Sequence, residues 1–309
     1  MHPETVAHTL LKRSESITLS TQRAKVRDIS ELFKLRLASL VVFSSVLGYF
    51  IGVETFAFGP FIALCLGGFL LTGASNAFNQ VWERNLDKLM ERTKNRPLPT
   101  GRMTVSEAIA YGTIAGISGI SILWFAINPL SGILGAFAFF SYVFVYTPLK
   151  QMTSLAVFVG AFPGAIPPML GYVAATGTFG VEPGILFAMQ FMWQFPHFWA
   201  IAWVSHEDYT RAGYQLLPLN EGKTKRTAFQ IFLYSLFLIP VSLLPWVFPT
   251  EAPMIGDISA IVTVLCGIGF SWYAWRLYLE RTDKAARALM FASFAYLPIV
   301  QIAYVLGSL

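Results

Sequence analysis

Nine stretches of apolar residues dominate this chain of 309 residues, and each is close to the roughly 20 residues that a helix needs to cross a bilayer. Charged residues make up only 13% of the sequence, whereas a soluble domain carries about 25%. The pattern therefore predicts an all-α integral membrane protein. The expected spans are residues 37–53, 58–80, 105–127, 131–147, 153–175, 183–204, 227–248, 254–275 and 288–306.

The basic residues all fall on one side of this nine-span arrangement. The 22 lysines and arginines lie in the N-terminal segment or in the connections after the second, fourth, sixth and eighth spans. The other connections carry Glu54, Glu182, Glu251 and Asp257 instead. The positive-inside rule therefore predicts a cytoplasmic N-terminus and a C-terminus outside. It also accounts for the net charge of +5 without a nucleic-acid partner.

Two parts of the chain are expected. Residues 1–34 would form a cytoplasmic tail with a short amphipathic helix near residues 26–35, and residues 35–309 an intramembrane domain. Two of the cytoplasmic connections, 84–104 and 205–226, are long and mix acidic with basic residues. Because long connections in a compact fold are usually functional, we expect functional residues at the cytoplasmic end.

The first long connection follows a ladder of oxygen-bearing side chains, Asn79, Glu83 and Asp87. Their spacing of four residues places them on one face of a helix, and the ladder begins next to the apolar stretch. Mg²⁺ takes oxygen ligands, commonly carboxylates together with substrate phosphates. Arg92 and Arg96, one helical turn apart, would meet the phosphate oxygens. The pattern predicts a magnesium site for a phosphorylated substrate; the alternative is a helix that simply becomes polar on reaching water.

A second group of polar residues lies in and after the sixth span. Gln194 and His197 are at membrane depth, where such groups usually mark function, and Glu207 and Asp208 follow at the cytoplasmic end. All four would face one cavity, although a buried histidine often serves only as a hydrogen-bonding group. Lys150 is the sole cation of its connection and would either reach a pyrophosphate or contact lipid headgroups.

Several motifs in these regions occur together and in order. They read Asn79-x3-Glu83-x3-Asp87, Met90-x-Arg92-Thr93-x2-Arg96-Pro97-Leu98, Tyr146-Thr147-Pro148-Leu149-Lys150, Gly164-Ala165-x-Pro167-Pro168-x2-Gly171, Trp193-Gln194-x-Pro196-His197-Phe198 and Glu207-Asp208-Tyr209-x3-Gly213. On these residues the chain resembles the UbiA superfamily of intramembrane prenyltransferases, and within it the branch that farnesylates protoheme IX. The second acidic motif departs from the repeated aspartates of quinone-type members, since only Glu207 and Asp208 remain.

The resemblance implies nine transmembrane helices around a central cavity and transfer of a farnesyl group from farnesyl diphosphate to a vinyl group of heme b, giving heme O and diphosphate. It implies Mg²⁺ as the cofactor that assists ionisation of the allylic diphosphate. The implied metal ligands are Asn79, Glu83, Asp87, Glu207 and Asp208. The diphosphate would bind Arg92, Arg96, Lys150 and Arg211, with Lys150 and Asp208 joining the ladder as catalytic residues. Contacts with heme or the prenyl chain are implied for His197, Trp193, Gln194, Tyr146 and Phe198.

The partners implied in the same way are heme b, farnesyl diphosphate, membrane lipids and, downstream, a heme A synthase and the assembly of a terminal oxidase. Two other functions stay open: a UbiA-type prenyltransferase with an aromatic quinone precursor or a chlorin as acceptor, and a secondary transporter that uses the polar groups of the sixth span. The bacterial cell inner membrane is the expected location, with the mitochondrial inner membrane as the alternative.

Overall fold

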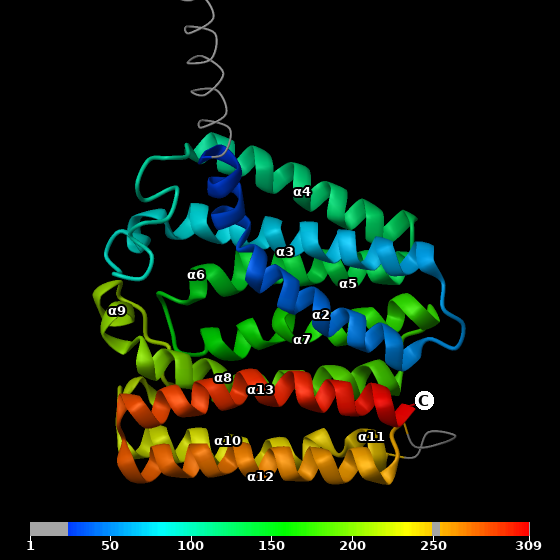
Figure 1. Ribbon diagram of the computed structural model, residues 1–309. Helices are drawn as coiled ribbons and strands as arrows, with labels where there is room; N and C mark the ends of the chain where they lie inside the picture. The colour runs from blue at the N-terminus through cyan, green and yellow to red at the C-terminus, as the bar shows by residue number, and fades with distance from the viewer. Residues whose placement is uncertain (1–23, 249–253, 309) are drawn as a thin grey trace, which may run out of the picture.

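The computed structural model describes residues 24–248 and 254–308 of the chain. These residues form helices joined by connections, and no β-strand occurs among them (Figure 1). Most of the expected tail, residues 1–23, lies outside the described residues, as do residues 249–253 and 309. The described part of the tail forms an N-terminal helix over residues 24–33, which confirms the short helix expected near residues 26–35.

Each expected span falls on a helical segment of the described chain. The elements are α2 (Leu35–Gly52), α3 (Phe58–Asp87), α4 (Val105–Phe125), α5 (Pro129–Phe140), η1 (Ser141–Tyr146), α6 (Thr147–Leu149), α7 (Ala156–Thr176), α8 (Val181–Val204), α9 (His206–Arg211), η2 (Pro218–Asn220), α10 (Lys225–Ser242), α11 (Leu244–Val247), α12 (Asp257–Glu280) and α13 (Asp283–Ser308). The fourth span is continuous through α5, the π-helical η1 and α6. The second span differs most from expectation, because α3 continues past residue 80 to Asp87.

Eight helical segments of the described residues are long and apolar enough to cross a membrane, so the chain is a multi-pass membrane protein. The expected sixth span, α8, does not meet that criterion, although it is 24 residues long. It carries Gln190, Gln194 and His197, all of them buried. Packing explains this composition, because α7, α10 and α13 surround α8 and cover its polar side chains with protein rather than lipid.

The helices lie side by side as a bundle, with the connection 88–103 and α9 at the same end (Figure 1). One apolar core lies among α2, α3, α4, α5 and α7, and a second lies mainly among α8, α10, α12 and α13. The two halves are joined because α2 packs on α13 and α7 packs on α8. Both long connections therefore meet over one end of the bundle.

Glycines allow α2 and α7 to pack with their backbones in contact. A Cβ atom added at Gly48 would lie 2.0 Å from the carbonyl oxygen of Pro168, and one added at Gly171 would lie 1.8 Å from that of Ser45. No side chain fits at either position unless the backbones separate. Small residues are the usual means by which membrane helices approach this closely.

A buried network of side chains fixes four helices close to this contact. Gln190 accepts hydrogen bonds at Oε1 from Ser44 at 2.8 Å and from Gln301 at 2.9 Å. Its Nε2 atom donates to the carbonyl oxygen of Gly164 at 2.7 Å. That carbonyl lies four residues before Pro168, which has no N–H with which to form the helical bond. Gln190 therefore supplies the donor that the proline lacks and ties α8 to α2, α7 and α13.

Replacing Gly171 by alanine is expected to lower the thermal unfolding midpoint in detergent. The added methyl group must separate α2 from α7, and overpacking of this kind costs about 1–3 kcal/mol. The matched control is Gly269→Ala on α12, where an added Cβ has no heavy atom within 4 Å. If the Gly171 variant unfolds at the same temperature as the wild type and the control, the backbone contact is not as close as described.

Candidate functional site

The oxygen ladder lies on the buried face of one continuous helix. Asn79, Glu83 and Asp87 all belong to α3, with exposed fractions of 2%, 6% and 0%. An α3 that merely became polar on reaching water would leave these side chains exposed. The burial therefore removes the alternative explanation of the pattern, and it requires that each polar group has a partner inside the protein.

Each ladder residue has one partner from another segment or a later turn of the chain. Asn79 donates to the hydroxyl of Thr147 at 3.3 Å. Glu83 Oε1 is 2.6 Å from Lys150 Nζ. Asp87 accepts from Arg96 Nη1, at 2.9 Å to Oδ1 and 2.8 Å to Oδ2. The ladder thus consists of one amide that donates a hydrogen bond and two carboxylates that are paired with cations.

The π-helical turn η1 explains how the fourth span reaches the ladder. Pro148 provides no N–H for a helical bond, and both the amide and the hydroxyl of Thr147 donate to the carbonyl of Tyr142. The wider turn directs Thr147 toward Asn79 and places Lys150 beside Glu83, with its ammonium 4.7 Å from the ring centre of Tyr146. Lys150 is only 9% exposed, so it faces inward rather than toward lipid headgroups.

The expected pairing of Arg92 and Arg96 on one helical face is wrong. Residues 88–103 form successive turns rather than an α-helix, and the two guanidinium groups have different partners. Arg96 contacts Asp87, whereas the exposed Arg92 donates to the hydroxyl of Tyr209 at 3.2 Å and lies 5.5 Å from its ring centre. Arg96 therefore belongs to the ladder, and Arg92 joins the connection to α9.

Asp208 holds the two long connections together. Its carboxylate accepts from the backbone amides of Glu91 at 3.3 Å and Arg92 at 3.4 Å, and it also pairs with Arg211. Glu207 is exposed beside it. Within the described residues no group of three or more His, Cys, Asp or Glu side chains is arranged to hold a metal ion. The proposed second metal site at Glu207 and Asp208 thus stays a prediction.

The polar residues of the sixth span face neighbouring helices. His197 shares a 2.7 Å hydrogen bond with the hydroxyl of Ser293 on α13, and its ring stacks on Trp193 at 4.3 Å. Trp193 donates to the carbonyl of Ser293 at 3.1 Å, and Gln194 donates to that of Ala161 on α7 at 2.8 Å. These contacts describe a packing role, and the heme role expected for the three residues stays a prediction.

An apolar cavity of about 250 Å³ lies between α2, α3, the fourth span and α7. Tyr142, Tyr146 and Phe198 contribute to its wall, so two of the five residues expected to contact heme or the prenyl chain line it. Asn76 also lines it and lies one turn before Asn79 on α3. The cavity therefore borders the polar ladder, which places a buried charged site next to an apolar chamber.

Lys34, to which sequence reasoning gave no role, lies near enough to the ladder for its charge to interact with those of Glu83 and Asp87. It connects the N-terminal helix to α2 in a left-handed conformation with φ of 50°, and α3 fixes the preceding carbonyls of Leu32 and Phe33 through Gln80 and Asn76. Together, burial and the cations Arg96 and Lys150 lower the pKa of Lys34 to about 7, although Glu83 and Asp87 act in the opposite direction. The described site therefore brings three cations together with two carboxylates.

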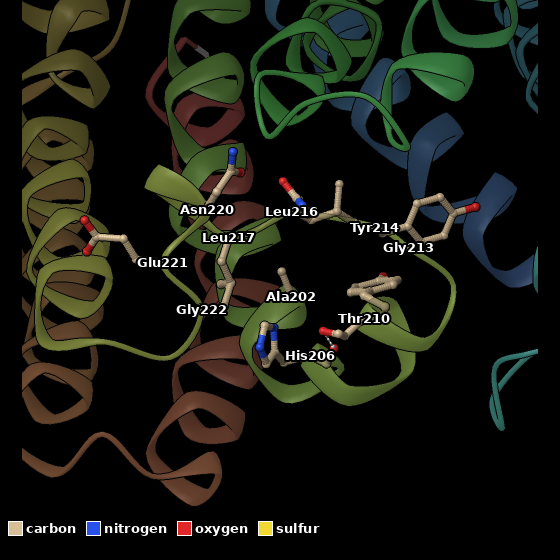
Figure 2. Close-up of a pocket in the computed structure, with 12 residues that line it drawn as sticks. Ala202, His206, Thr210, Gly213, Tyr214, Leu216, Leu217, Asn220, Glu221 and Gly222 are labelled. Atoms are coloured by element: carbon tan, nitrogen blue, oxygen red, sulfur yellow. Dashed lines mark hydrogen bonds between the residues drawn. The ribbon is translucent and has the colours of Figure 1, made fainter.

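A second, polar hollow of about 350 Å³ lies among the end of α8, α9 and the segment that follows (Figure 2). His206, Thr210 and Glu221 contribute to it, and none of the ladder residues does. Tyr214 stands at its edge with the hydroxyl pointing away from His206 (Figure 2). The hollow is thus separate from the ladder.

Comparison with known proteins supports the resemblance that the motifs indicated. The model of the UbiA prenyltransferase family matches residues 41–296. A protoheme IX farnesyltransferase of Christiangramia forsetii is 52% identical over 279 residues, which are 90% of this chain and 92% of that protein. One of Flavobacterium psychrophilum is 49% identical over 94% of this chain and 97% of that protein.

Solved structures share the fold. A structure of digeranylgeranylglyceryl phosphate synthase superposes with a TM-score of 0.76 at 18% identity, covering 92% of this chain and 98% of that one. A UbiA homologue from Archaeoglobus fulgidus, solved with GPP and Mg²⁺ bound, has a TM-score of 0.65 at 13% identity, covering 90% and 99%. At these identities the likeness establishes the helical architecture alone.

Removing the Asp208 carboxylate is expected to loosen residues 88–103. Asp208→Ala leaves the amides of Glu91 and Arg92 without their acceptor, so hydrogen–deuterium exchange of peptides covering them should become faster. The control is Glu207→Ala, which changes an exposed neighbouring carboxylate. Unchanged exchange in the Asp208 variant would show that this carboxylate does not fix the connection.

Proposed function

Because the chain belongs to the UbiA prenyltransferase family, we propose that it transfers a farnesyl group from farnesyl diphosphate to a vinyl group of heme b, giving heme O and diphosphate. Its relatives at 48–52% identity carry the name protoheme IX farnesyltransferase and match along nearly their whole length. The observation that carries the proposal in this chain is the buried, cation-paired ladder beside an apolar cavity. An isoprenoid diphosphate likewise has a charged diphosphate group, which would bind at the ladder, and an apolar chain, which would occupy the cavity.

We assign nine membrane spans, with α8 as the sixth, an N-terminus in the cytoplasm and a C-terminus outside. The length of α8 and its cover of neighbouring helices support the count. In this arrangement the connection 88–103 and α9 face the cytoplasm, which is where a soluble diphosphate leaves. The membrane is then the bacterial cell inner membrane, and the product passes to a heme A synthase and terminal oxidase assembly.

The residues of the ladder fit a magnesium ion. Asn79, Glu83 and Asp87 offer one amide oxygen and two carboxylates from one helix face, and their present partners are a hydroxyl and two cations. Mg²⁺ held there would offset the charge that develops on the departing diphosphate, with Asp208 on α9 as a further carboxylate at the same end of the bundle.

Lys150 and Arg96 would exchange partners when the diphosphate binds. In the structure they neutralise Glu83 and Asp87, at 2.6 Å and 2.8 Å. Phosphate oxygens are equally good acceptors for ammonium and guanidinium groups. The two cations would then bind the diphosphate together with Lys34, while Arg92 and Arg211 remain at the outer rim of the site.

The apolar cavity would hold the farnesyl chain and exclude water. The step that limits such a transfer is the breaking of an allylic carbon–oxygen bond, which leaves positive charge on carbon. The rings of Tyr142, Tyr146 and Phe198 line the cavity, and an aromatic face stabilises a cation by about 0.5–2 kcal/mol. The acceptor would approach from α8, where Trp193, Gln194 and His197 lie.

The proposed activity is tested by incubating the purified protein with heme b, farnesyl diphosphate and Mg²⁺ and measuring farnesylated porphyrin by mass spectrometry. Asp87→Asn should reduce the product by at least about 100-fold, since charge stabilisation of this kind is worth that much in the transition state. The control is Asp283→Asn at the start of α13, whose carboxylate pairs with Lys223. Preference for a hydroxybenzoate over heme, or full activity of the Asp87 variant, would refute the assignment.

The charge on Lys34 predicts a pH dependence of diphosphate binding. Its pKa of about 7 means that the ammonium form disappears as the pH rises through 7, so the affinity for Mg²⁺-diphosphate should fall by up to about tenfold per pH unit above that value. Lys34→Arg keeps its charge at every pH of interest. Titration calorimetry between pH 6 and about 8.5 compares the two proteins.

Ionisation of the diphosphate itself affects both proteins equally, so the difference between their curves isolates Lys34. Parallel curves for wild type and Lys34→Arg would show that Lys34 keeps its proton throughout this range or does not contact the ligand.

A further inference from the structure

Three leucine side chains close the apolar cavity at the end remote from the ladder. Leu71 on α3, Leu123 on α4 and Leu170 on α7 belong to its wall, and all three are buried. They meet at Gly135 on α5. A Cβ atom added there would lie 2.6 Å from Leu123 Cδ1, 2.9 Å from Leu71 Cδ2 and 3.9 Å from Leu170 Cδ1. The floor of the cavity is therefore one layer of side chains from adjoining helices.

Leu123 is held between two glycines. A Cβ atom added at Gly67 on α3 would lie 2.9 Å from Leu123 Cγ and 3.0 Å from its Cδ2, and Gly135 on α5 leaves room for Cδ1 in the same way. Because both helices lack a side chain at these positions, the leucine fills the space between them, and close packing of this kind fixes its methyl groups. Leu123 thus forms a barrier between the cavity and the apolar core beyond it, which includes Leu64 two turns further along α3.

The depth of the cavity is measured along α3. Its lining residues on this helix run from Asn76, next to the ladder, back to Leu71 and Gly68. Counted from Asn79, Leu71 is eight residues away and Gly68 eleven, which is about 12 Å and about 16 Å at a rise of 1.5 Å per residue. A chain whose diphosphate binds at the ladder therefore reaches the leucine layer after about 12–16 Å.

An isoprenoid chain of fifteen carbons matches this depth. An extended carbon chain advances about 1.2 Å per bond, judged from the polypeptide backbone, which spans about 3.5 Å in three bonds. The eleven bonds along a farnesyl chain then span about 13 Å, compared with about 8 Å for a geranyl chain and about 18 Å for a geranylgeranyl chain. The shorter chain would leave the far part of the cavity empty, and the longer chain would have to displace the leucines.

We propose that Leu123 and Leu71 determine the length of the isoprenoid chain and select a farnesyl group from shorter and longer ones. The inference rests on the proposed function, because it takes the diphosphate to bind at the ladder. It adds to that function the residues that discriminate among substrates, and both lie outside the motifs that carry the family resemblance. Removing the barrier should favour a longer chain, and raising the floor should favour a shorter one.

Two variants change the floor in opposite directions. Leu123→Ala removes the barrier, whereas Thr72→Leu raises the floor, since Thr72 lines the cavity one residue nearer to the ladder than Leu71. The matched control is Leu64→Ala, which makes the same deletion in the same core at a fully buried residue outside the cavity wall.

Each protein receives equal concentrations of geranyl, farnesyl and geranylgeranyl diphosphate together with heme b and Mg²⁺, and the prenylated porphyrins are compared by mass spectrometry. Affinity for each diphosphate is also measured by calorimetry with Mg²⁺ and without heme. A wild type that binds the three diphosphates but transfers none of them to heme contradicts the proposed acceptor, and the affinities then decide the chain length.

The wild type and Leu64→Ala should transfer mainly the farnesyl group. Leu123→Ala should raise the ratio of geranylgeranyl to farnesyl product by at least about tenfold, because one methylene in an apolar pocket already changes discrimination by about 10–200-fold. Thr72→Leu should raise the ratio of geranyl to farnesyl product by a similar factor. The proposal is overturned if either variant, recovered in folded form, keeps the product ratios of the wild type, which would mean that the chain leaves the cavity between the helices.

Discussion

The paired charges along the inner face of α3 constrain the folding of every segment around them. Glu83 and Asp87 are buried, and a buried carboxylate that loses its counter-ion costs about 3–5 kcal/mol. Two different segments therefore have to bring a cation to α3. The π-helical turn of the fourth span places Lys150 there, and the connection after α3 folds back to place Arg96. The conformations of both segments follow from the need to neutralise one helix face.

The close packing of the neighbouring helices is a second constraint, because it sets the shape of the apolar cavity beside the ladder. The contact of α2 with α7 through Gly48 and Gly171 sets one wall of the apolar cavity. Prolines in α7 would weaken that wall by leaving carbonyls without donors, but Gln190 on α8 supplies one of the missing bonds. The low hydropathy of α8 thus has a structural reason, because an apolar side chain in place of Gln190 could not donate this hydrogen bond.

The sequence predicted the features that depend on periodicity and failed at those that depend on turns. Helical spacing placed Asn79, Glu83 and Asp87 on one face, and the apolar stretches located the helices to within a few residues. Arg92 and Arg96 were misplaced together because residues 88–103 form turns, where a spacing of four has no fixed meaning. Lys34 was not recognised, since its direction is set by its own left-handed backbone conformation. The local sequence does not encode which way such turns aim a side chain.

The charges of the described residues also bear on the ligand proposed for them. Lys34, Arg96 and Lys150 outnumber Glu83 and Asp87, which leaves one positive charge in excess where Lys34 is protonated. The chain maintains this excess at a cost, because a left-handed lysine is itself strained by about 1–3 kcal/mol. A fully ionised prenyl diphosphate carries three negative charges, and with one Mg²⁺ it adds a single net negative charge. The complex would then be neutral, whereas either component alone would leave a net charge in a region of low dielectric. Metal and diphosphate should therefore bind together, each raising the affinity for the other.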